Sequence, residues 1–121
     1  MTSLLDTVAL EELKALSPEN PKELLTELVE TYMKQAHLEV QNLHIFSQEG
    51  KWDEVSKSAH RLKSASFQIG AGRVGELSNE IETTLRLGQS GASLLPLISE
   101  LRKDYDETLR LLREYLDKLI S

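Results

Sequence analysis

The 121-residue chain contains no cysteine, no apolar run near the length of a membrane span and no basic, apolar leader at its start. The lack of cysteine excludes a disulfide framework and a thiolate metal site, and it suits a reducing compartment. A membrane-spanning helix needs about 20 consecutive apolar residues, and Met-Thr-Ser-Leu-Leu-Asp does not resemble a secretory signal. We therefore expect a cytoplasmic protein with a single domain over residues 1–121, and the initial methionine favours a stand-alone protein.

Strand patterns, Asn-Gly hairpin turns, internal repeats and a Gly-x-x-x-x-Gly-Lys phosphate loop are also missing. The net charge of −6 argues against a nucleic-acid partner, which would require a basic face. The segment 51–73 is different, because it carries five basic residues against two acidic ones. Its positive charge suits an anionic partner or a phosphoryl group, although an ordinary solvated helix face is an equally good interpretation.

Apolar residues recur at steps of three and four positions, which is typical of amphipathic helices. We expect a short helix over about 6–16 and then a long helix that ends near Ser47. Asn20 is the predicted N-cap of the long helix. Pro21 stands at its first position and Glu23 at its third, a capping-box arrangement.

Three further helices are expected: one from Trp52 to Gly70, one that carries Val74 through Leu85, and one from Leu94 to Leu119. A flexible connection over 88–93 precedes the last of them, with Ser93 as its cap. Short connections imply that consecutive helices are antiparallel. The sequence therefore predicts an all-α fold, an antiparallel up-down four-helix bundle with an additional short N-terminal helix as a lid or brace.

The helix that begins near Trp52 has a distinct outer face. At 100° per residue, one sector collects its apolar and small residues, which should be buried: Val55, Ala59, Leu62, Ser66 and Ile69. His60 lies about 140° from the centre of that sector. Lys63, Ser64 and Phe67 surround it, so we expect an exposed histidine beside a lysine and an aromatic ring outside the core.

An exposed imidazole can serve as both nucleophile and leaving group, because its ordinary pKa is about 6.5. Lys63 can offer charge to a phosphoryl group on His60, and the small side chain of Ser64 leaves room for it. An exposed ring at Phe67 is typical of a docking patch. Each feature has a plainer interpretation: the histidine–lysine pair can be an ordinary surface pair, and Phe67 a core residue.

The order of residues from His60 to Ala71 narrows these alternatives. His-Arg-Leu-Lys-Ser-Ala-Ser, followed by Ile-Gly-Ala, resembles the signature of histidine-containing phosphotransfer (HPt) domains, and the resemblance covers about residues 10–116. It implies that His60 is the phosphorylated histidine, that Lys63 gives electrostatic support and that Gln68 orients the ring. Ser64 stands where the family usually has glycine.

The resemblance also implies the function, a phosphorelay intermediate. Nε2 of His60 would accept a phosphoryl group from an aspartate of a response-regulator receiver domain and pass it to another receiver. No cofactor or metal is expected on this chain, which is not a kinase, because the partner supplies the aspartate and Mg²⁺. The protein is expected to be a monomer. Its expected partners are receiver domains and a hybrid sensor kinase, which would dock on Arg61, Ser64 and Phe67.

Other classes remain open. A dimerising histidine domain of a sensor kinase is disfavoured, because that class has glutamate where Arg61 follows His60 and a proline soon after, whereas the next proline here is Pro96. A non-catalytic helical scaffold and a kinase-derived HPt module stay as alternatives. His37 and His44 lie about 10.5 Å apart along one helix, too far to bind one metal ion together.

Overall fold

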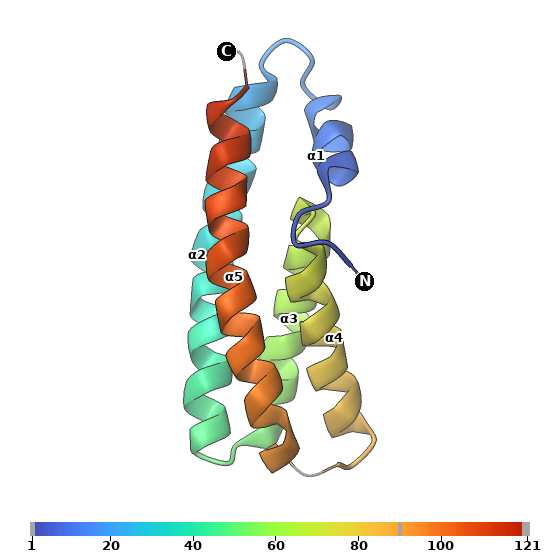
Figure 1. Ribbon diagram of the computed structural model, residues 1–121, viewed down its shortest axis with the longest axis vertical. Coiled ribbons are helices and arrows are strands. Elements are labelled where there is room, and N and C mark those ends of the chain that lie inside the picture. The colour runs from blue at the N-terminus through green and yellow to red at the C-terminus, as the bar shows by residue number, and fades with distance from the viewer. Residues whose placement is uncertain (1, 90, 120–121) are drawn as a thin grey trace.

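The computed structural model describes residues 2–89 and 91–119, and all regular elements in these ranges are helices (Figure 1). The elements in chain order are α1 (Thr7–Lys14), α2 (Pro21–Gln48), α3 (Trp52–Ile69), α4 (Gly72–Arg86), the short 3₁₀ helix η1 (Gly91–Leu94) and α5 (Leu95–Asp117). This confirms the all-α prediction and the number of long helices. None of the helices in the described ranges has the length and apolarity that crossing a membrane requires.

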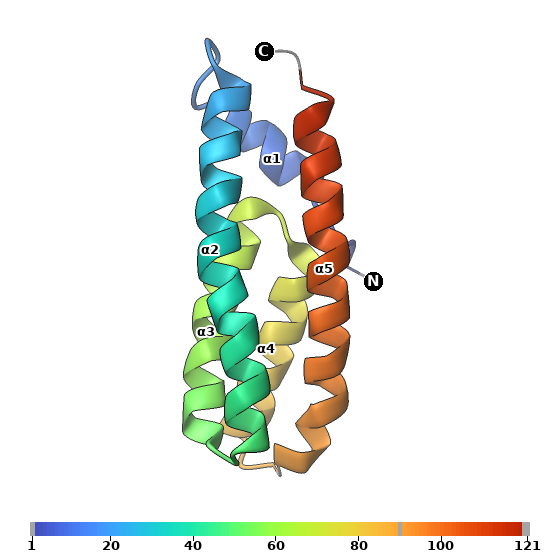
Figure 2. The ribbon, with the colours of Figure 1, turned by 90° about the vertical axis from the view of Figure 1, so that its left-hand side faces the viewer.

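Helices α2 to α5 run up and down along the long axis of the molecule (Figures 1 and 2). Helix α3 packs against α2 and α4, and α5 packs against the same two helices, so α3 and α5 occupy opposite corners of the bundle. The pair α2 and α5, with 28 and 23 residues, is longer than α3 and α4, with 18 and 15. Helix α1 lies beyond the end of α3 and α4, in the space that their shortness leaves (Figure 1).

Of the two expected helix caps, Asn20 is confirmed in position and Ser93 is wrong. Asn20 precedes α2 as predicted, but its side chain makes no capping hydrogen bond, because its backbone (φ −138°, ψ 59°) departs from the extended geometry of a capping residue. Ser93 does not cap α5, because η1 continues directly into that helix and Leu94 becomes the preceding residue. The connection expected over 88–93 thus includes helical residues, and its Ser90 lies outside the described residues.

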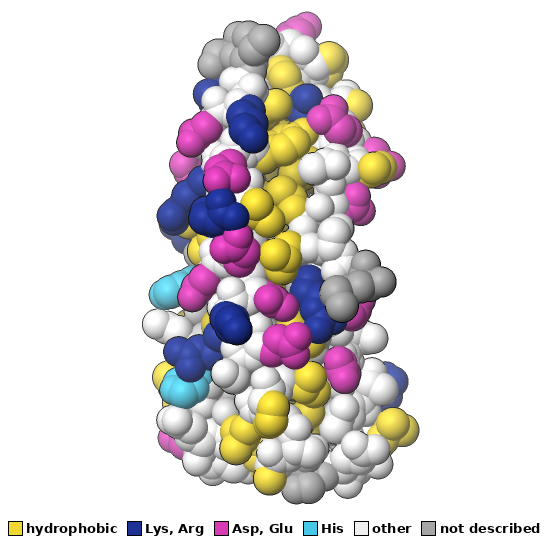
Figure 3. All heavy atoms as spheres, in the orientation of Figure 1, with side chains coloured by type: hydrophobic (Ala, Val, Ile, Leu, Met, Phe, Trp, Pro, Cys, Tyr) yellow, Lys and Arg dark blue, Asp and Glu magenta, His cyan; other side chains and the backbone are white. Residues whose placement is uncertain are grey.

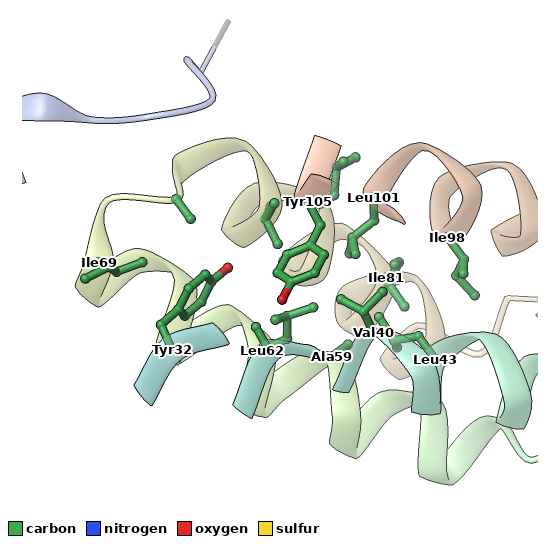
Figure 4. Packing of buried hydrophobic residues seen from close by; sticks show 14 of the residues in the cluster. Tyr32, Val40, Leu43, Ala59, Leu62, Ile69, Ile81, Ile98, Leu101 and Tyr105 are labelled. Atoms are coloured by element: carbon green, nitrogen blue, oxygen red, sulfur yellow. The ribbon is translucent and has the colours of Figure 1, made fainter. Parts of the chain in front are cut away.

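The core confirms the buried face predicted for α3. Tyr32 and Tyr105 approach edge to face inside the bundle, with ring centroids 6.4 Å apart, and the hydroxyl groups of Tyr32 and Ser66 are hydrogen-bonded at 2.8 Å. Burial raises the pKa of Tyr105 to about 12. Figure 4 shows part of this core, to which α3 contributes Val55, Ala59, Leu62 and Ile69. Each large aliphatic side chain buried in this way stabilises the fold by roughly 1.5–3 kcal/mol.

Gly70 ends α3 and attaches α1 to it. Its φ of 84° is left-handed, and a Cβ at this position would meet the backbone oxygen of Asp6 at 2.7 Å. The Asp6 amide donates to the Gly70 carbonyl at 2.7 Å, while the Asp6 side chain caps α1 by accepting from Val8 at 3.0 Å. Leu10 of α1 is fully buried, so this short helix is part of the core.

Candidate functional site

His60 projects outward from the middle of α3. Its side chain is 60% exposed, whereas Ala59 before it and Leu62 after it are fully buried. The two buried neighbours fix the helix against the core, and they therefore fix the direction in which the imidazole leaves it. The prediction of an exposed histidine is confirmed.

The imidazole and the neighbouring lysine share one carboxylate on α4. His60 Nδ1 lies 2.7 Å from Glu82 Oε2, and Lys63 Nζ donates to the other oxygen, Oε1, at 2.6 Å. The Glu82 side chain is only 16% exposed. Glu82 therefore holds both groups from the side of the core.

This contact selects one form of the neutral ring. A carboxylate can only accept, so Nδ1 carries the proton and donates it to Glu82. The lone pair is then on Nε2, the ring nitrogen farther from the helix. The arrangement presents an exposed nitrogen that can act as a nucleophile.

The charge of Glu82 is secured by the same two partners. Its partial burial acts to raise its pKa, but the hydrogen bonds from Lys63 and His60 outweigh this effect and the pKa lies below the ordinary glutamate value. The carboxylate is therefore ionised at neutral pH, and Lys63 neutralises it. The positive charge of Lys63 is thus already paired in the unphosphorylated protein.

Arg61 lies beside His60 on the flank of α3 that faces α2, whereas Glu82 contacts the flank that faces α4. Its guanidinium donates from Nε and Nη2 to Glu39, with Nη2 3.2 Å from Oε1, and the hydrogen bond to Glu39 raises the pKa of Arg61. Glu39 is only 4% exposed, and Asn42 donates to the same carboxylate at 3.3 Å. Arg61 therefore anchors α3 to α2, while about half of its side chain stays exposed, 47%.

Ser64 and Phe67 lie on the exposed face with His60. The Ser64 hydroxyl donates to the His60 carbonyl at 3.4 Å, so it turns toward its own helix. Phe67 is 50% exposed, which confirms its position outside the core. Its ring lies so close to Gly75 of α4 that a Cβ there would meet ring atom Cε1 at 2.7 Å.

Gln68 lies apart from the imidazole. It is eight residues beyond His60, about 12 Å along the helix, and it lines an apolar groove of about 350 Å³ with Leu13 of α1 and Tyr32 of α2. In the structure, the contact with the ring nitrogen that was expected from Gln68 is made by Glu82. The orienting group thus comes from the next helix.

Sequence reasoning missed Glu82 because its link to His60 depends on the pairing of two helices. An antiparallel pair that turns at Ala71 brings together residues equidistant from the turn. His60 and Glu82 are separated by 22 residues with Ala71 midway, and Phe67 and Gly75 are also centred on Ala71. Reflection of the sequence about this turn would have found both contacts.

A shallow hollow of about 360 Å³ adjoins the imidazole. Its lining consists of Ser56, Lys57, His60, Arg61 and Glu82. The hollow lies on the N-terminal side of His60, since its α3 lining starts one turn before the histidine. Within the described residues, no three histidine, aspartate or glutamate side chains are arranged to hold a metal ion.

The Hpt domain family model matches residues 22–120 of this chain. The chain belongs to the Hpt domain family. Histidine phosphotransfer in phosphorelays with receiver domains is the role of this family, so the Hpt domain is a phosphotransfer carrier. The match begins within α2, and α1 precedes it.

Two solved structures are similar to this Hpt domain in fold. Histidine-containing phosphotransfer protein B (HptB) from Pseudomonas aeruginosa PAO1 has a TM-score of 0.81 and 20% identity, covering 99% of this chain and 100% of its own. A putative histidine-containing phosphotransfer protein from rice has a TM-score of 0.71 and 20% identity, covering 93% of this chain and 85% of its own. The bundle fold, including its N-terminal helix, is therefore shared with HptB over nearly the full length. No curated protein matches the chain in sequence.

Proposed function

We propose that His60 accepts a phosphoryl group on Nε2 from an aspartyl phosphate of a receiver domain and passes it to the aspartate of another receiver. The single observation that carries this proposal is the 2.7 Å contact between Nδ1 and Glu82. It supports the assignment because a proton held at Nδ1 leaves the exposed nitrogen as the nucleophile.

The transfer step balances without any group from elsewhere on this chain. The Nε2 lone pair forms the N–P bond, the P–O bond to the donor aspartate breaks, and the carboxylate leaves with the bonding electrons. The ring keeps its Nδ1 proton and becomes positively charged, and the Glu82 carboxylate 2.7 Å away stabilises that charge. Transfer to the second receiver reverses these changes and restores the neutral imidazole.

The remaining chemistry belongs to the partner. Phosphoryl transfer has a loose, in-line transition state that needs positioning and charge neutralisation more than covalent assistance. The receiver supplies the aspartate and Mg²⁺, and this domain acts without kinase activity of its own. A monomeric state, a cytoplasmic location and a hybrid sensor kinase as a further partner are parts of the same proposal.

Receivers are proposed to dock over the exposed face of α3. Arg61, Ser64 and Phe67 are exposed there around His60. The apolar groove that includes Gln68 continues this face toward α1 and α2. A half-exposed aromatic ring beside a reactive group supports the assignment, since apolar surface of this kind often marks an interaction site.

A receiver domain carrying labelled aspartyl phosphate tests the function directly. We expect label to move to wild type and to His44→Gln, a matched control on α2, but not to His60→Gln. Each receiver of the source organism should be tried, since the sequence does not identify the partner. If no receiver transfers label to the folded wild type, the scaffold alternative is favoured.

A further inference from the structure

Three cationic side chains of α3 lie within about one turn of His60, and they differ in how strongly they are already paired. Lys63 donates to Glu82 at 2.6 Å, and Arg61 is bound to the buried carboxylate of Glu39. Lys57 has a much weaker partner. Its Nζ lies 3.5 Å from Glu54, and both side chains are largely exposed, 64% and 45%.

An exposed ion pair at that distance contributes little, so Lys57 can leave it at small cost. Lys63, in contrast, cannot leave its ion pair at small cost. The imidazole is neutral until the N–P bond forms, so departure of Lys63 would leave the largely buried Glu82 carboxylate without a cation at that stage. The unneutralised carboxylate beside the ring would repel an incoming phosphoryl group. Among these three cations, Lys57 is therefore the one available to a new anion.

The direction in which the imidazole points also favours Lys57 as the cation that binds a new anion. Side chains on an α-helix lean toward its N-terminus, so the ring of His60 covers the turn that contains Ser56 and Lys57. The hollow beside the ring is lined by Lys57 and Ser56, whereas Lys63 is not part of its lining. The open space next to the imidazole is thus on the Lys57 side.

We propose that Lys57 binds the phosphoryl oxygens when the group is on Nε2 of His60, and that Lys63 is a positioning residue that holds Glu82. This inference rests on the proposed function. Side chains three residues apart on a helix start about 5–6 Å from each other, a gap that the flexible lysine stem spans. Lys57 forms no covalent bond and loses no proton. Its ammonium group donates hydrogen bonds to the phosphoryl oxygens as the N–P bond forms.

Chemical phosphorylation tests this without any receiver. Phosphoramidate transfers its phosphoryl group to an accessible imidazole, and its P–N bond breaks to release ammonia. The pKa of the bound phosphoryl group can then be followed by the ³¹P chemical shift during a pH titration. A cation beside the group favours its dianion and lowers that pKa, so the titration reports the charge next to the phosphorus.

We compare wild type with Lys57→Gln, Lys57→Arg, Lys63→Gln and Lys103→Gln. Lys103 is an exposed lysine on α5, at the opposite corner of the bundle from α3, and it controls for the loss of one charge. Lys57→Gln should raise the phosphoryl pKa by about 0.8, as expected for one charge roughly 4 Å away in water. Lys57→Arg should restore the wild-type value, and Lys103→Gln should leave it unchanged.

The inference is overturned if Lys57→Gln and Lys103→Gln titrate alike, or if only Lys63→Gln raises the phosphoryl pKa. Because Lys57 is exposed, its two variants should retain the fold, and circular dichroism checks the fold of every variant. Failure of the proposed function gives a different pattern, in which phosphoramidate labels His60 but no receiver does. Failure of phosphoramidate to label His60 in the folded protein overturns both proposals, because Nε2 is then not an accessible nucleophile.

Discussion

The outer faces of the bundle carry histidines in two opposite electrostatic settings. On α3, His60 Nδ1 faces the carboxylate of Glu82 at 2.7 Å. On α2, His44 Nδ1 faces the guanidinium of Arg102 from α5 at 3.1 Å. Histidine side chains lie along the left edge of Figure 3, and the lower one is next to lysine or arginine side chains.

The partner of Nδ1 decides which nitrogen of each neutral ring is the nucleophile. Glu82 accepts, so His60 carries its proton on Nδ1 and leaves a lone pair on Nε2. Arg102 can only donate, so Nδ1 of His44 accepts and its Nε2 carries the proton. The two rings therefore differ in tautomer, and the carboxylate behind His60 leaves it an Nε2 lone pair that the neutral ring of His44 lacks.

The largest expected effect comes from removal of that carboxylate. Glu82→Ala should slow phosphoryl transfer to His60 by about 10-fold or more, because loss of the hydrogen-bonding partner behind a histidine ligand costs about 10- to 100-fold in metal sites that use the same arrangement. The variant leaves the imidazole free to rotate and to exchange its proton between nitrogens. The rate is measured with a labelled receiver.

Glu80→Ala is the matched control, since Glu80 is an exposed glutamate two residues earlier on α4. It should transfer at the wild-type rate. Equal rates for Glu82→Ala and wild type would contradict the view that Glu82 distinguishes His60 from His44.

A second prediction reverses the setting of His44. In wild type at neutral pH, ¹⁵N spectra of the imidazole rings should show the proton on Nδ1 of His60 and on Nε2 of His44. Arg102→Glu should move the His44 proton to Nδ1, because the new carboxylate accepts. The His60 signals act as the internal control, and the same tautomer for both rings in wild type would remove the basis of the comparison.

The helices and the exposed face of α3 that carries His60 could be predicted from the sequence, because both depend on local periodicity. The spacing of Val55, Leu62 and Ile69 defines the buried sector, and His60 follows from it by angle alone. The absence of a capping hydrogen bond at Asn20 and the failure of Ser93 to cap α5 could not be predicted in this way. The first depends on the backbone angles of one residue, and the second on the 3₁₀ helix that continues into α5.

The contact between Glu82 and His60 could not be predicted from local periodicity either. The residue type of Glu82 and its place in α4 are visible, but its contact with His60 depends on how α3 and α4 turn at Ala71. The resemblance implies an orienting role for Gln68, on the same helix as the histidine. The tertiary pairing of α3 with α4 gives the ring a carboxylate instead.

A smaller effect on the transfer rate should distinguish the apolar side chain near His60 from the one near His44. Phe67, close to His60, is 50% exposed, and Ile45, next to His44, is 49% exposed. We expect Phe67→Ala to slow transfer from a receiver by roughly threefold, since a half-buried docking side chain contributes less than about 1 kcal/mol. Ile45→Ala should leave the rate unchanged.

Thermal unfolding of both variants separates docking from packing. Each should lose only a small and similar amount of stability, because each side chain is half exposed. A loss of several kcal/mol in Phe67→Ala alone would show that the ring over Gly75 is a core contact, and the docking role would then be wrong.

The smallest expected effect is a pH-dependent stability term from Glu82. Its pKa is lowered in the folded protein, where the hydrogen bonds from Lys63 and His60 outweigh the effect of burial. A lowered folded pKa stabilises the fold above the unfolded glutamate pKa of about 4.3, and this contribution is lost as the pH falls through the folded value. The free energy of unfolding in urea should therefore be higher for wild type than for Glu82→Gln by about 1 kcal/mol or less at pH 7, and the difference should vanish in stronger acid.

Glu80→Gln controls for the removal of one charge from α4. A difference between wild type and Glu82→Gln that stays constant down to pH 2 would show that the shared carboxylate is not stabilised by its charged partners, and the contrast with His44 would then rest on hydrogen-bond direction alone.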